Sequence, residues 1–135
     1  MKRALWAILV LSSLEACKKS SVPPNGSLFG KWELHRRYGG NIYPPDTTFK
    51  AGNGNIFQFD PDSTYRSYTN GTLTRSGVFH TITIPNFAFD AKPIEYLYFD
   101  SDRSDQTEIS LSGNTLTFFP FLPDIGTTQY NKIAN

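Results

Sequence analysis

The chain has 135 residues, with 13 Lys and Arg against 12 Asp and Glu, which gives a formal net charge of +1 at neutral pH. Without a basic excess it has little to attract the phosphates of nucleic acid, so we expect no nucleic-acid partner. It has a single cysteine, which excludes an internal disulfide and a thiolate metal cage.

Residues 1–16 have the pattern of an export signal. Lys2 and Arg3 give a positive start, and the apolar run 4–11 that follows is shorter than the roughly 20 residues a membrane-spanning helix needs. A charged start, a short apolar centre and a small polar exit, here Ser12-Ser13, are typical of signal peptides. We therefore expect residues 1–16 to be removed from the mature protein.

The signal ends in Leu14-Glu15-Ala16-Cys17, which resembles the lipobox of bacterial lipoproteins, although Glu15 stands where a small or uncharged residue is usual. The resemblance implies cleavage before Cys17 and attachment of three acyl chains, which together hold a protein stably to a membrane. The alternative is an ordinary secretory signal followed by a chance cysteine. That alternative would leave Cys17 as an exposed thiol.

Residues 17–27 are polar, contain two prolines and lack periodic hydrophobicity, so they are interpreted as a lipidated cysteine and a tether. Lys18 and Lys19 would lie beside the lipid headgroups, where basic side chains are attracted by anionic lipid. Lys18 after the cysteine, in place of Asp, resembles the signal for the outer membrane. We therefore expect a lipid-anchored, periplasm-facing protein of the outer membrane.

Residues 28–135 are interpreted as one all-β domain. The chain has eleven Phe, seven Tyr and two Trp, and aromatic and β-branched residues broken up by Gly, Asn, Asp and Pro favour strands and turns. Alternation is clear in the first strand, which places Trp32, Leu34, Arg36 and Tyr38 on one face and Lys31, Glu33, His35 and Arg37 on the other. The expected strands cover residues 28–38, 55–59, 64–68, 73–84, 94–99, 108–111, 115–119 and 127–133.

Eight strands with mostly short connections predict an antiparallel meander. Such a meander closes best into an up-and-down barrel of about eight strands, because closure leaves no unpaired edge. A split β-sandwich is the structural alternative.

Gly30-Lys31-Trp32 at the start of the first strand resembles the G-x-W signature of the lipocalin superfamily. The layout over residues 28–133 resembles the lipocalin-like domains of small bacterial lipoproteins. The resemblance implies that Gly30 permits a tight entry, that Trp32 closes the lower end of the barrel, and that a basic residue of the last strand packs over the indole. Lys132 is the candidate for that residue, where Arg is usual in the family.

In an up-and-down barrel, the connections 39–54, 69–72, 100–105 and 120–126 lie together at the open end. The lipocalin resemblance implies that the first of them acts as a lid. Apolar residues at such a mouth can receive a hydrophobic ligand or a protein, or can fold inward and fill the core. Asn86-Phe87-Ala88-Phe89 is expected to plug the opposite end. The candidate ligand-binding residues are Tyr38, Ile42, Tyr43, Phe121 and Leu122.

Neither His35 nor His80 has a carboxylate at a catalytic or metal-ligand spacing, so a surface and a wall position are the preferred interpretations. The oxygen-rich segment 100–105 could attract calcium, but it lacks the EF-hand loop's glycine and glutamate, and a solvated turn is preferred. No G-x-S-x-G, H-E-x-x-H or phosphate-loop motif occurs. We expect no enzyme activity, no metal and no cofactor.

The leading hypothesis is a membrane-anchored, lipocalin-like lipoprotein that binds a small apolar or amphipathic ligand in the cell envelope. The alternative is a filled barrel that contacts or inhibits another envelope protein and takes no small ligand.

Overall fold

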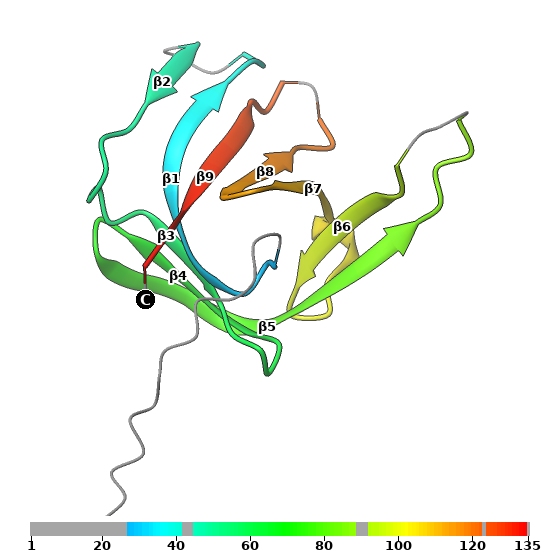
Figure 1. Ribbon diagram of the computed structural model, residues 1–135, viewed down its shortest axis with the longest axis horizontal. Helices are drawn as coiled ribbons and strands as arrows, with labels where there is room; N and C mark the ends of the chain where they lie inside the picture. Colours follow the sequence, from blue (N-terminus) through cyan, green and yellow to red (C-terminus); the bar gives the residue numbers. More distant parts are fainter. Residues whose placement is uncertain (1–26, 42–44, 89–91, 123, 135) are drawn as a thin grey trace, which may run out of the picture.

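The computed structural model describes residues 27–41, 45–88, 92–122 and 124–134, and these form an all-β domain (Figure 1). Among them, no helix is long and apolar enough to cross a membrane. The predicted signal peptide, Cys17 and nearly all of the predicted tether lie outside the described residues. The elements are β1 (Gly30–Tyr38), β2 (Asp46–Thr48), β3 (Ile56–Phe59), β4 (Thr64–Thr69), β5 (Thr72–Ile84), β6 (Ile94–Phe99), the 3-10 turn η1 (Arg103–Asp105), β7 (Thr107–Ser112), β8 (Thr115–Phe119) and β9 (Thr127–Ile133).

The strands pair antiparallel in chain order, and β9 returns to pair with β1, so the sheet closes on itself. The closed wall contains eight strands, β1 and β3 to β9. The short strand β2 lies in the first connection and pairs only with the outer half of β1. The predicted up-and-down barrel of about eight strands is confirmed, and the β-sandwich alternative is wrong because a single sheet encloses the core.

One feature of β1 differs from its predicted alternation. Leu34 pairs with Tyr130 of β9, but the next pair joins Arg36 to Gln129, so His35 forms a bulge. A bulge adds one residue and reverses the faces beyond it. Arg37 consequently lies on the same side as Leu34 and Tyr130, and the predicted single face through Trp32, Leu34, Arg36 and Tyr38 is wrong.

Arg36 and Tyr38 contact each other and β2 on the outer face of β1. The Arg36 guanidinium lies 4.9 Å from the centroid of the Tyr38 ring. It also donates through Nε to Asp46 of β2, at 2.9 Å. Both interactions are on the outside of the wall, because Arg36 pairs with Gln129 and Tyr38 with Thr127, on the face opposite the buried Tyr130.

The lower and middle parts of the barrel are packed with side chains. The largest fully buried residues are Trp32, Phe59, Tyr65, Leu97 and Leu116. Above them the ring of Phe57 stacks on Phe59 and Phe99, with ring centroids 5.8 and 5.9 Å apart. An eight-stranded barrel has an interior just wide enough for such side chains, so this region leaves no space for a ligand.

Trp32 closes the lower end of the barrel beneath the N-terminal segment. Its indole Nε1 donates to the carbonyl of Leu28 at 2.6 Å. Lys132 Nζ lies 4.9 Å from the Trp32 ring centroid and donates to the carbonyl of Ser27 at 3.0 Å. Burial lowers the pKa of Lys132. The cation–π contact that the sequence predicts between these two side chains is therefore present.

Glu33 is buried although it faces away from Trp32 and Leu34. Its carboxylate accepts hydrogen bonds from the backbone amides of Gly52 and Gly54, at 2.8 and 3.1 Å. The first connection thus folds over the outside of β1 and is fixed there.

These two glycines provide a matched pair of substitutions. Both have a positive φ, so alanine strains the backbone at either position. A Cβ at residue 52 would meet nothing within 4 Å, whereas one at residue 54 would lie 2.5 Å from the Gly71 backbone nitrogen. We expect Gly52→Ala to lower the free energy of unfolding by about 1 kcal/mol, and Gly54→Ala by about 1–3 kcal/mol more. Urea unfolding measures both, and equal losses would contradict this packing of the two turns.

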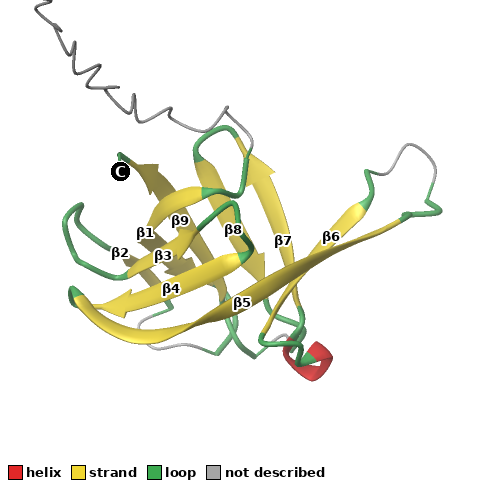
Figure 2. Cartoon of the chain, turned by 90° about the horizontal axis from the view of Figure 1, so that it is seen from below, coloured by secondary structure: helices red, strands yellow, loops and turns green. Residues whose placement is uncertain are grey.

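The hairpin of β5 and β6 projects from the barrel as an arm, which Figures 1 and 2 show. β6 pairs with β5 as far as Ile94, but its pairing with β7 ends at Glu95. Pro93 has no amide hydrogen to extend that second ladder. Phe87 at the end of the arm is 94% exposed, so the expected plug of the lower end is wrong for the described part of 86–89.

Candidate ligand site at the barrel mouth

The connections after β1, β4, β6 and β8 meet at the end of the barrel opposite Trp32. The Gly71 amide donates to the Gly54 carbonyl at 2.9 Å, which joins the first two. The Asn41 amide donates to the Asp124 carbonyl at 3.0 Å, which joins the first to the last. Backbone hydrogen bonds therefore join three of the four connections, although these are far apart in sequence.

A cup of about 520 Å³ opens at this mouth. Its floor consists of the aromatic rings that cover the packed core, and one wall is the apolar connection between β8 and β9. In that connection Phe121 is 87% exposed, and Leu122 and Ile125 are each more than half exposed. The apolar residues of the cup are Phe57, Phe99, Phe118, Pro120, Phe121, Leu122 and Ile125.

A smaller compartment of about 220 Å³ adjoins the cup between β1, β3, β4 and β9. Phe57 and Tyr130 line both spaces, and their rings meet edge to face with centroids 5.5 Å apart. Burial raises the pKa of Tyr130 to about 12, while the positive charge of Arg37 acts in the opposite direction. Polar groups line most of this compartment, among them Arg37, Asn55, Ser67 and Thr69.

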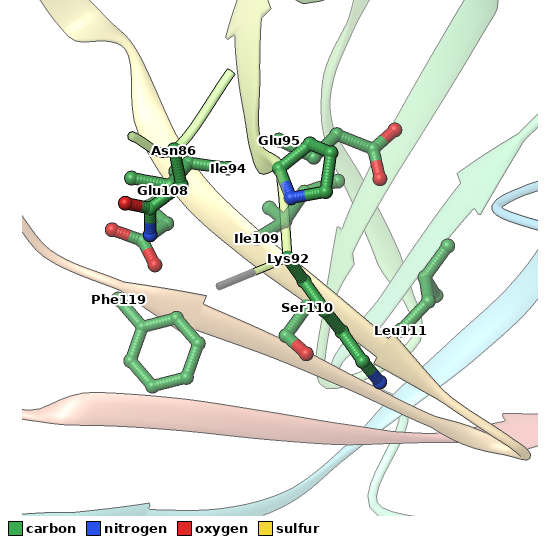
Figure 3. Close-up of a pocket in the computed structure, with 10 residues that line it drawn as sticks. Asn86, Lys92, Ile94, Glu95, Glu108, Ile109, Ser110, Leu111 and Phe119 are labelled. Carbon is green, nitrogen blue, oxygen red and sulfur yellow. The ribbon is translucent and has the colours of Figure 1, made fainter. Parts of the chain in front are cut away.

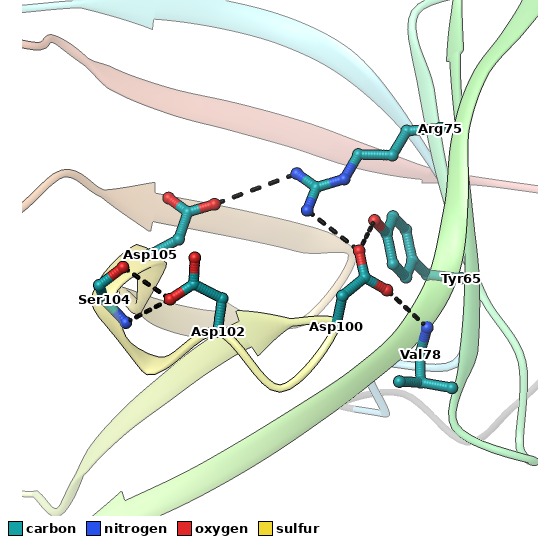
Figure 4. A network of polar contacts seen from close by, with 7 residues as sticks. All are labelled: Tyr65, Arg75, Val78, Asp100, Asp102, Ser104 and Asp105. Atoms are coloured by element: carbon teal, nitrogen blue, oxygen red, sulfur yellow. Dashed lines mark hydrogen bonds and ion pairs between the residues drawn. The ribbon is translucent and has the colours of Figure 1, made fainter.

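A network around Asp100 holds β4, β5 and the start of the β6–β7 connection together (Figure 4). The Asp100 carboxylate accepts from the Val78 amide at 3.0 Å, from the Tyr65 hydroxyl at 3.0 Å and from Arg75 at 3.1 Å. Burial alone would raise the pKa of Asp100, but these hydrogen bonds outweigh it and hold the pKa below its usual value. Gly77 leaves room for this carboxylate, because a Cβ there would overlap Asp100 Oδ1.

The oxygen atoms of segment 100–105 bond mainly to the protein itself. Asp102 accepts from the amide and the hydroxyl of Ser104, at 2.9 and 2.6 Å, and so caps η1. Over the part of the chain that the structure describes, no group of three His, Cys, Asp or Glu side chains is arranged to hold a metal ion.

The predicted ligand-binding residues do not all lie in the cup. Phe121 and Leu122 line the cup. Tyr38 lies on the outer wall because of the bulge at His35. Ile42 and Tyr43 lie outside the described residues.

Several lining residues were missed by the sequence reasoning. Phe57 lies two residues before the buried Phe59, and Phe118 lies two residues after the buried Leu116, so the period-two pattern could have identified them. Tyr130 could have been found in the same way. Arg37 could not, because nothing in the sequence marks the bulge that turns it inward.

A separate groove of about 580 Å³ lies between the arm and β7 (Figure 3). Glu95, Glu108 and Lys92 border it together with Ile109 and Phe119. The groove is larger than the cup, but three charged residues line it, whereas Asp105 is the one charged residue among those that line the cup, and no exposed apolar connection covers the groove. The cup is therefore the better candidate for an apolar ligand.

Comparison of the chain with models of protein families, with curated proteins and with solved structures finds no match. The function is accordingly argued from the geometry and chemistry of the mouth.

Proposed function

We propose that this protein is an exported, lipid-anchored lipocalin-like lipoprotein whose barrel binds a small apolar or amphipathic molecule in the cell envelope. The observation that carries the proposal is the aromatic cup, which combines about 520 Å³ of space with exposed Phe121 and Leu122 at its rim. Ligand pockets typically occupy about 300–1,000 Å³ and are lined mostly by apolar and aromatic side chains.

The packed core determines where the ligand would lie. Trp32, Phe59 and Leu116 are completely buried in the lower barrel, so a ligand would rest on the rings of Phe57 and Phe99 near the mouth. The barrel is thus filled below and open above. This arrangement supports binding of a short or partly inserted molecule.

The proposed anchor suits this arrangement. Ser27, the first described residue, bonds to Lys132 at the closed end. A tether to a lipidated Cys17 would therefore join the barrel at the end opposite the cup. The mouth would remain accessible to molecules in the periplasm.

Phe121 and Phe87 provide the test of the cup. Phe121→Ala should weaken binding of an uncharged, environment-sensitive naphthylamine probe about tenfold, because the Phe121 ring would be buried against it. Phe87→Ala, which removes an equally exposed ring from the arm, should leave probe affinity unchanged. Neither substitution should lower the unfolding midpoint appreciably, since both rings are exposed.

The arm favours a second candidate, a module that contacts another envelope protein. The hairpin projects from the barrel and exposes Phe87 beside a charged groove. An exposed aromatic side chain with charged neighbours is typical of a surface that binds another protein. Probe binding that responds to Phe87→Ala and not to Phe121→Ala would favour this candidate over the cup.

A further inference from the structure

Arg37 owes its position to the bulge at His35, which places it on the inner face of β1, where it is exposed at the mouth and lines the smaller compartment. Its guanidinium lies 5.8 Å from the ring centroid of Phe49, a residue packed against the core. Bulges often serve to re-aim a side chain near a functional site. The neighbouring Arg36, in contrast, is on the outer wall.

The charge of Arg37 has no carboxylate partner at ion-pair distance among the residues that the structure describes. Arg36, Arg66 and Arg75 each pair with an aspartate. Arg103 lies over Tyr98 on the outer wall. Arg37 is therefore the arginine that brings an unneutralised positive charge to the mouth.

Tyr130 presents a second polar group to the same compartment. Its side chain is 9% exposed, and its hydroxyl forms no hydrogen bond with any described residue. No polar side-chain atom of the described residues is both fully buried and unpaired, so this hydroxyl keeps access to the space that it borders. It can donate to an acceptor placed there.

We propose that Arg37 and Tyr130 bind the carboxylate of an amphipathic ligand whose apolar part occupies the cup. This inference rests on the proposed ligand-binding function and adds the charge and orientation of the ligand. The two spaces are adjacent, because Phe57 and Tyr130 line both, and a ligand that occupied both would pass beside these two rings. About 220 Å³ accommodates a carboxylate, and the planar guanidinium matches its two oxygens.

The test compares dodecanoic acid with dodecanol, which have the same chain length but differ in charge at neutral pH. Each displaces the uncharged naphthylamine probe from the soluble protein that begins at Lys18. Wild-type protein should bind the acid about tenfold more tightly than the alcohol. Arg37→Gln should abolish this preference, because it weakens binding of the acid far more than binding of the alcohol, and Tyr130→Phe should reduce the preference.

Arg36→Gln is the matched control, since it removes an adjacent arginine from the outer wall and should leave the preference intact. Equal affinity for acid and alcohol in the wild type, or a preference that survives Arg37→Gln, would overturn the inference while leaving the proposed function in place. Failure of both compounds and of the probe to bind would contradict the proposed function itself.

Discussion

Trp32→Ala should lower the free energy of unfolding by about 3–5 kcal/mol, the range for removing a large aromatic side chain from a packed core. Trp32 is completely buried. The substitution leaves a cavity at the closed end and removes the hydrogen bond to the Leu28 carbonyl. It also exposes Lys132 Nζ to the space that the indole occupied. Denaturant unfolding of the form beginning at Lys18, followed by far-ultraviolet circular dichroism, measures the loss.

Trp32→Phe is the control for this prediction. It keeps much of the apolar volume but loses the indole hydrogen bond, so it should cost clearly less than Trp32→Ala. Tryptophan fluorescence cannot follow either variant, because Trp6 is absent from this form and Trp32 is its remaining tryptophan. A loss below about 1 kcal/mol for Trp32→Ala would show that the closed end is not closed by this residue.

Cys17→Ser should abolish lipid attachment entirely. Each methylene buried in a bilayer contributes about 0.8 kcal/mol, so three acyl chains would hold the protein stably, and serine offers no thiol for lipid attachment. Cells fed an alkyne-bearing fatty acid should label the wild-type protein and leave the variant unlabelled.

A second form separates anchoring from export. The domain beginning at Lys18, placed behind an ordinary secretory signal, should appear in the soluble periplasmic fraction, whereas the wild type should need detergent for release. Label on Cys17→Ser, or wild-type protein released without detergent, would contradict lipidation at this cysteine.

The strand pattern and closure of the barrel could be predicted from the sequence because they depend on a local signal. Residues 108–111 alternate polar and apolar side chains, and the turn residues Ser112-Gly113-Asn114 separate them from residues 115–119. Both segments form strands. Sequential antiparallel pairing then leaves closure as the way to remove the edges. The pairing of Lys132 with Trp32 followed from the family resemblance.

The remaining features depend on contacts between distant segments. The bulge at His35 arises from how β1 pairs with β9, and no residue type announces it. Glu33 lies on the outer face of β1, as the alternation of the strand predicts. It is nevertheless buried, because residues 52–54 fold over it. The polar compartment was missed because Arg37 was assigned to the outer face.

The arm is another feature that the sequence pattern does not predict. The strand count places residues 86–89 at the end opposite the mouth, where they are expected to act as a plug. Phe87 is exposed because β5 extends well beyond the ladder that β6 forms with β7.

The central claim is that the mouth holds a small apolar or amphipathic molecule. The most direct measurement is the native mass spectrum of the form beginning at Lys18, purified from the periplasm without organic solvent. We predict a discrete mass above that of the bare chain, which organic solvent removes and which gives the mass of the ligand. A bare mass that stays unchanged after incubation with an envelope lipid extract would contradict the claim.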